Sequence, residues 1–234
     1  MRILLATPPM VQINTPYPAT AYLTGYLRSL KNPDLVVAQC DPAIELIETL
    51  FTKKSLQFIA RKIKDKKSPA IKYFLAHKKE YFYTVEEVVK FLQGKNPNLC
   101  TALAMRTYVP EGPRFQPLKT EAELQETLKL LPEVDQAKHI ASLFLDDIAD
   151  IIHQGIDKRF EFSRYGEQLA ASQISFAPIL KSLKTRTFVD KILEKLCQIH
   201  VEKFLPDILC ISVPFSGNMY GALRMAKFIK KNYP

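Results

Sequence analysis

Apolar residues at the two ends of the chain form short unbroken runs separated by helical patterns. Residues 3–6 and 35–38 are runs of the kind found in strands buried on both faces of a parallel sheet, and residues 207–213 contain a third. Between the first two runs, residues 19–30 place five apolar side chains at helical spacing toward a core: Tyr22, Leu23, Tyr26, Leu27 and Leu30. The order strand, helix, strand predicts an α/β fold with a parallel sheet.

The long middle of the chain is predicted to be mainly helical. Two sequences have the capping-box pattern of a helix start, at Thr84–Glu87 and at Thr120–Glu123, and Gly94 is a plausible helix stop. An apolar stripe over 134–151 predicts a further helix that ends near Gly155. We therefore expect one domain made of residues 1–44 and 189–234, interrupted by a helical insertion over 45–188.

Near the end of the chain, the pattern predicts a helix over 217–231 followed by a turn at 232–234. In an alternating α/β pattern that turn leads into a further strand, and a parallel sheet of only three strands has an unpaired edge. We therefore expect a truncated domain, part of a longer protein. A short protein that pairs its sheet edges in a dimer is the alternative.

From the composition we expect a soluble, globular protein in a reducing compartment. Hydrophobic residues make up 47% of it, no stretch approaches the ~20 apolar residues that cross a bilayer, and its first apolar run is too short for a secretory signal. The four cysteines are far apart and lack metal-binding spacing, so we expect mostly buried, reduced thiols: Cys40, Cys100, Cys197 and Cys210. The expected location is cytoplasmic.

Three loops follow the predicted strands, at the edge where open parallel sheets bind ligands. They span residues 7–19, 40–42 and 214–218. The last one begins a helix, whose backbone N–H groups suit an anionic or amide oxygen, with Ser216 or Asn218 as the cap and Gly217 allowing close approach. A plain capped turn explains the same residues.

Two separated segments together resemble one known family. The first is Arg-Ile-Leu-Leu-Ala-Thr-Pro-Pro at 2–9 with Pro-Tyr-Pro-Ala at 16–19, and the second is Pro-Asp-Ile-Leu-Cys-Ile-Ser-Val-Pro-Phe-Ser-Gly-Asn at 206–218. Both are similar to the cobalamin-binding-type domain that precedes the catalytic barrel in many radical S-adenosylmethionine enzymes. The resemblance implies a three-layer, Rossmann-like (flavodoxin-like) parallel sheet, and it implies these residues lining the cofactor or substrate site: Pro8, Pro9, Asn14, Tyr17, Asp41, Ser212, Phe215, Ser216, Gly217 and Asn218.

Two departures from the family pattern limit what the chain can do alone. The loop after the first strand lacks the family's Asp-x-His-x-x-Gly sequence, so either cobalamin binds without a histidine ligand or only the scaffold has been kept. The Cys-x-x-x-Cys-x-x-Cys motif is also absent, so the four-iron cluster and S-adenosylmethionine belong to a downstream barrel in the parent protein. We expect no catalytic or metal-ligating residue here. The parent reaction implied is radical methylation or modification of a ring or carbon skeleton.

Two other functions remain open. Residues 53–79 carry ten basic side chains against the single acid Asp65, interleaved with Phe58, Tyr73 and Phe74, a pattern that RNA or anionic lipid could bind. A solvated helical face with core aromatics explains it better, so nucleic acid is not the expected partner. The second alternative is a flavodoxin-like nucleotide-binding domain unrelated to cobalamin, although the Gly-x-Gly-x-x-Gly fingerprint is missing.

Overall fold

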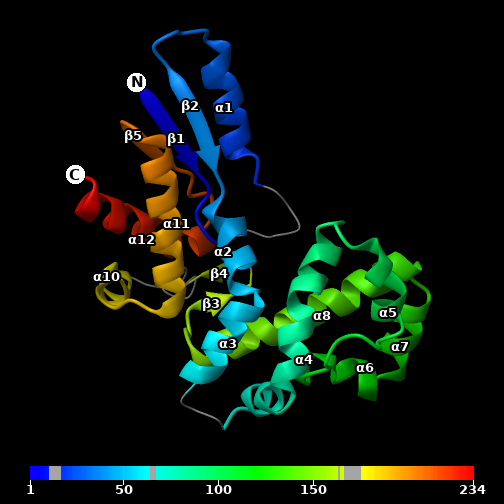
Figure 1. The fold of residues 1–234 in the computed structure, drawn as a ribbon. Coiled ribbons are helices and arrows are strands. Elements are labelled where there is room, and N and C mark those ends of the chain that lie inside the picture. Colours follow the sequence, from blue (N-terminus) through cyan, green and yellow to red (C-terminus); the bar gives the residue numbers. More distant parts are fainter. Residues whose placement is uncertain (11–16, 64–66, 163, 166–174) are drawn as a thin grey trace. The chain divides into compact units, whose positions relative to one another are not determined.

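The computed structural model describes residues 1–10, 17–63, 67–162, 164–165 and 175–234 (Figure 1). It is an α/β protein that is mostly helical, with one three-stranded parallel sheet. The chain forms two compact units, Met1–Ile47 with Arg159–Pro234, and Glu48–Lys158. We refer to the first as the α/β unit and to the second as the helical unit.

The sheet confirms the three predicted strands and their parallel pairing. Strand β1 (Arg2–Ala6) lies between β2 (Val36–Cys40) and β5 (Ile208–Ile211). In the register, Leu4 is opposite Ala38 on one side and Leu209 on the other. The side chains of β1 are buried from Ile3 onward, as expected for a central strand covered on both faces. Among the described residues, β5 has no strand on its outer edge.

Helix α1 (Ala19–Ser29) covers one face of the sheet, where Leu27 packs against Ile3, Leu5 and Val37. The predicted orientation of this helix is wrong. Its buried positions are Thr20 and Thr24, whereas four of the five apolar residues assigned to the core are exposed: Tyr22, Leu23, Tyr26 and Leu30. Helical periodicity correctly identified an apolar face of α1. The face that packs on the sheet, however, is the neighbouring one, which contains Thr20 and Thr24.

The opposite face of the sheet is covered by α11 (Phe188–Phe204) and α12 (Ser216–Asn232), which lie against each other. Helix α10 (Ala177–Lys184) contacts α12, and the two-residue strands β3 (Phe160–Glu161) and β4 (Arg164–Tyr165) pair in antiparallel fashion. Helix α11 starts with a true capping box, in which Thr187 and Asp190 exchange hydrogen bonds between side chain and backbone.

The helical unit follows α2 (Pro42–Leu50), which leads out of the α/β unit. Its central helix, α8 (Glu133–Gly155), packs on α4 (Pro69–Leu92), where the rings of Tyr81 and Phe144 stack with centroids 5.3 Å apart. The shorter elements of this unit are α3 (Lys53–Lys62), η1 (Pro97–Leu99), α5 (Cys100–Ala104), η2 (Pro113–Phe115), α6 (Pro117–Thr120) and α7 (Ala122–Lys129).

Both predicted capping boxes in this unit are wrong, whereas the predicted helix stop is confirmed. Thr84 lies inside α4, and its hydroxyl donates to the carbonyl of Glu80 at 2.9 Å instead of accepting from the backbone. Thr120 likewise donates to the carbonyl of Gln116, one turn back. Gly94 follows the end of α4 with a φ of 72°, a left-handed value that glycine adopts without steric cost.

Among the described residues, no helix combines the length and apolarity that crossing a bilayer requires.

Candidate functional site

The loop that follows β1 packs against the first turns of α12 at the carboxyl edge of the sheet. The side-chain amide of Asn218 donates from Nδ2 to the carbonyls of Pro8, at 3.2 Å, and Met10, at 2.7 Å. The backbone N–H of Met10 donates to the carbonyl of Gly217 at 3.4 Å. The approach is so close that a Cβ on Gly221 would lie 2.2 Å from the carbonyl oxygen of Pro9. Two segments from opposite ends of the chain are thereby held in one fixed arrangement.

Asn218 also carries an acceptor that the described part of the protein leaves without a hydrogen bond. The residue is fully buried, and its Oδ1 has no hydrogen-bond partner. An unsatisfied buried acceptor costs about 1–3 kcal/mol. A donor N–H or O–H group brought within reach of Oδ1 would remove that cost.

Within the described residues, no side chain caps the N-terminus of α12, contrary to the prediction that Ser216 or Asn218 would provide the cap. Its N-cap is Phe215, in extended conformation and without a side-chain hydrogen bond to the helix. The Phe215 ring is 62% exposed and meets the ring of Tyr17 edge-on, with centroids 5.9 Å apart. Helix N–H groups and an accessible aromatic pair thus lie beside the buried amide.

The other predicted site residues have structural contacts at the same edge or fall outside the description. Asp41 is the N-cap of α2, where its Oδ1 accepts from the backbone N–H groups of Ala43 and Ile44, both at 3.1 Å. Burial raises the pKa of the Asp41 carboxyl. Ser212 extends the pairing of β5, since its N–H donates to the carbonyl of Ala6 at 3.0 Å. Asn14 lies outside the described residues.

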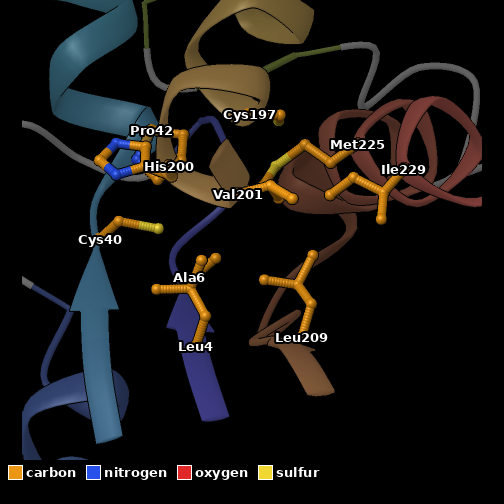
Figure 2. A pocket seen from close by; sticks show the side chains of 10 residues that line it. All are labelled: Leu4, Ala6, Cys40, Pro42, Cys197, His200, Val201, Leu209, Met225 and Ile229. Carbon is orange, nitrogen blue, oxygen red and sulfur yellow. The ribbon is translucent and has the colours of Figure 1, made fainter. Parts of the chain in front are cut away.

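A small apolar pocket lies between the sheet and the helices α11 and α12 (Figure 2). Its volume is about 10 Å³, close to the minimum that one water molecule needs. The pocket is lined by Leu4, Ala6, Cys40, Pro42, Cys197, His200, Val201, Leu209, Met225 and Ile229. It is therefore too small to hold a cofactor.

The two thiols of this pocket are unsuited to nucleophilic chemistry. Burial raises the pKa of Cys40 to about 12 and also raises that of Cys197, so both remain protonated at neutral pH. His200, on the same pocket wall, is paired through Nε2 with Glu45 at 2.7 Å. No local sequence pattern indicates this pair, because Glu45 and His200 are 155 positions apart.

A buried charge network, made of Arg159, Asp190, Tyr220 and Arg224, fixes the start of α12 against α11. The Asp190 carboxylate accepts from Arg159 Nη2 at 3.0 Å and from the Tyr220 hydroxyl at 3.1 Å, and it lies 3.2 Å from Arg224 Nη2. Asp190 is completely buried, and Arg224 is only 2% exposed. Arg224 also donates to carbonyls at the end of α10, including that of Leu183. The network holds the helix that carries Asn218 and is not itself open to a ligand.

No three histidine, cysteine or acidic side chains among the described residues are grouped so that they could hold a metal ion. The structure does bring together most of the predicted lining residues of the first and third loops: Pro8, Pro9, Tyr17, Phe215, Gly217 and Asn218. The chain matches no protein-family model, no curated protein and no solved structure. Similarity to other proteins therefore assigns neither a family nor a function.

Proposed function

We propose that the α/β unit is the Rossmann-like, cofactor- or substrate-binding accessory domain of a cobalamin-type radical S-adenosylmethionine enzyme. The observation that carries this proposal is the buried, unpartnered Oδ1 of Asn218 beside the uncapped N-terminus of α12. Both lie at the carboxyl edge of a parallel sheet, where such folds bind ligands. The sequence resemblance of the same two loops adds the cofactor class.

The donor and acceptor groups at this edge suit the periphery of a corrin ring. Corrin side chains end in amides, whose N–H groups are donors for Asn218 Oδ1 and whose carbonyls are acceptors for the N–H groups of α12. The exposed ring of Phe215, beside Tyr17, offers apolar contact to a flat macrocycle. No histidine belongs to this group of residues, so cobalt ligation by this loop is not part of the proposal.

When bound, cobalamin would supply methyl-transfer or electron-transfer chemistry to a catalytic barrel elsewhere in the parent protein. The residues of this chain bind and orient the group. Asn218 fixes the loop after β1 through the carbonyls of Pro8 and Met10, and the network around Asp190 fixes the helix that carries Asn218. Reductive cleavage of S-adenosylmethionine needs cluster-binding cysteines, and this sequence has no motif for them.

Equilibrium dialysis against hydroxocobalamin, read from the absorbance of the cofactor itself, tests the proposal. We expect saturable binding that Phe215→Ala weakens about tenfold, equivalent to about 1.4 kcal/mol. The control is Phe176→Ala, because Phe176 is also an exposed phenylalanine of the α/β unit and lies outside the proposed site. Absence of saturable binding, or equal affinities for the two variants, would contradict the proposal.

A flavodoxin-like nucleotide-binding domain is the second candidate. The observation that favours it is the 17-residue helix α12 with no side-chain cap at its N-terminus, an arrangement that suits a phosphate group. Dialysis against a flavin nucleotide and a nicotinamide dinucleotide separates the two candidates. Saturable binding of either nucleotide without any response to cobalamin would select this second function.

A further inference from the structure

The formal net charge of the protein is concentrated in one short stretch. Residues 49–79 contain ten of the 33 basic residues and one of the 24 acidic residues, so the rest of the chain holds 23 of each. The net charge of +9 is therefore the net charge of these 31 residues. Such a concentration favours a partner with repeated negative charge.

Most of the described residues of this stretch lie in two neighbouring helices of the helical unit, α3 and the first part of α4 (Figure 1). The start of α3 lies beside the part of α4 that follows a kink at His77, since the backbone N–H of Lys53 donates to Oε1 of Glu86 at 2.9 Å. We define the basic hairpin as residues 53–62 and 67–83. Helix α3 is about 15 Å long at 1.5 Å per residue, and it carries two basic residues at each of its ends.

The basic side chains of the hairpin are exposed, and most have no acidic partner. No salt bridge joins any of the following five to a described residue: Lys54, Arg61, Lys72, Lys78 and Lys79. Several bases elsewhere in the helical unit are paired with acids, such as Arg106 with Glu111 at 2.6 Å and Arg114 with Asp150 at 2.6 Å. The hairpin thus carries positive charge without acidic partners, whereas in the rest of the unit acidic partners balance several of the bases.

An exposed aromatic ring accompanies this charge. Tyr83 is 70% exposed, and Lys53 Nζ lies 4.7 Å from the centroid of its ring. The aromatics singled out from the sequence are less accessible: Phe74 is buried, and Tyr73 is half-buried and stacks on His77. Tyr83, which lies just beyond the basic stretch, is the residue that could stack on a base.

The surroundings favour a polyphosphate over a membrane. An amphipathic helix that binds lipid inserts large apolar side chains beside its basic ones. Among the described residues, no large hydrophobic side chain is exposed between Val36 and Tyr83. A single nucleic-acid strand needs phosphate contacts and an aromatic surface instead, and the basic hairpin offers both.

We propose that the basic hairpin binds single-stranded nucleic acid, with its lysines and arginine on the phosphates and Tyr83 against a base. This reverses the expectation from sequence, which treated the basic run as a solvated face. Five phosphate contacts give a logarithmic salt slope of about −3.5. Raising the salt concentration from about 50 to about 200 mM should therefore weaken binding on the order of 100-fold.

Fluorescence anisotropy of the full chain with a labelled single-stranded oligonucleotide of about 15 nucleotides tests this proposal. The hairpin variant replaces five bases by glutamine: Lys54, Arg61, Lys72, Lys78 and Lys79. The control variant makes the same change at five exposed lysines of the α/β unit: Lys181, Lys184, Lys191, Lys230 and Lys231. The two variants have the same net charge, so a difference between them reports the location of the charge. Circular dichroism confirms that both are folded.

We expect the hairpin variant to bind at least tenfold more weakly than the control and to lose most of the salt dependence. Tyr83→Ala should weaken binding to the single strand several-fold and leave binding to a duplex of the same sequence unchanged, because paired bases cannot stack on the ring. Equal affinities for the hairpin and control variants would overturn the proposal. Binding to vesicles containing phosphatidylserine without binding to the oligonucleotide would also overturn it, in favour of a membrane.

Discussion

Replacing Asp190 by asparagine tests whether the buried charge network holds the α/β unit together. The substitution keeps the shape of the side chain but removes the charge that lies 3.2 Å from Arg224 Nη2. Arg224 is 2% exposed, so water cannot replace the lost partner. Breaking a buried ion pair from one side costs about 3–5 kcal/mol. Whole domains are stable by about 5–15 kcal/mol, so the variant should lose a large fraction of its stability.

Urea unfolding followed by circular dichroism measures this loss, since the protein has no tryptophan for fluorescence. The control is Asp34→Asn, the same chemical change at an exposed position of the same unit, expected to shift the free energy of unfolding by less than about 0.5 kcal/mol. Adding Arg224→Gln to Asp190→Asn should cost less than the sum of the single changes, because Arg224 is then no longer a buried charge without Asp190, and only Arg159 still lacks this partner. A loss below about 1 kcal/mol for Asp190→Asn would refute this reasoning.

Three further predictions concern single sites. Burial raises the pKa of Asp147 to about 6, so the folded protein holds a proton that the unfolded chain releases, and stability falls as the pH rises from about 4 to about 6. Urea unfolding should show that the free energy of unfolding falls by up to about 3 kcal/mol over this pH range in the unchanged protein and that Asp147→Asn lacks this fall. The same pH dependence in both proteins would contradict the assignment of the raised pKa to Asp147. Gly221→Ala should destabilise the protein in thermal unfolding, because the added Cβ would lie 2.2 Å from a backbone oxygen. Gly25→Ala adds a Cβ in open space and should stabilise the protein by up to about 1 kcal/mol. Equal effects of the two substitutions would contradict this prediction. A disulfide reagent should modify the exposed Cys210 quickly and the buried Cys40 only on unfolding, and rapid modification of both would show that the pocket opens.

The sheet was predictable because its strands are apolar runs too short for a typical helix and bounded by loop residues. The runs that became β1, β2 and β5 are short, apolar and followed by loops, so their strand state and parallel pairing followed from sequence. The face of α1 was not predictable in the same way. Of its two buried threonines, Thr20 meets the hydroxyl of Thr7 at 3.4 Å, whereas Thr24 Oγ1 has no hydrogen-bond partner among the described residues.

Helix caps show why a short motif is not enough. The pattern at Thr84 failed because α4 begins earlier, at Pro69, and continues through the threonine. The same kind of pattern at Thr187–Asp190 does cap a helix, and it is readable from the sequence. Its second role, pairing Asp190 with Arg159 and Arg224, depends on contacts between distant segments and could not be read from local sequence.

The sequence predicted which loops form the candidate site, but it did not predict the hydrogen bonds within the site. The rule that ligands bind beyond the carboxyl ends of parallel strands correctly brought the loop after β1 and the start of α12 to one edge. The hydrogen bonds from Asn218 to the carbonyls of Pro8 and Met10 join residues about 200 positions apart. These hydrogen bonds form only when the sheet has brought the two segments together. The same is true of the burial that leaves Asn218 Oδ1 without a partner.

The outward-facing apolar side of α1 has a practical consequence for anyone who studies this protein. Tyr22, Leu23, Tyr26 and Leu30 remain exposed in the folded chain. Environment-sensitive dyes that report unfolding respond to accessible apolar surface, and here the native state already presents it. Dye-based melting curves should therefore start from a high signal and understate the transition, so spectroscopic methods that read the backbone are the better choice.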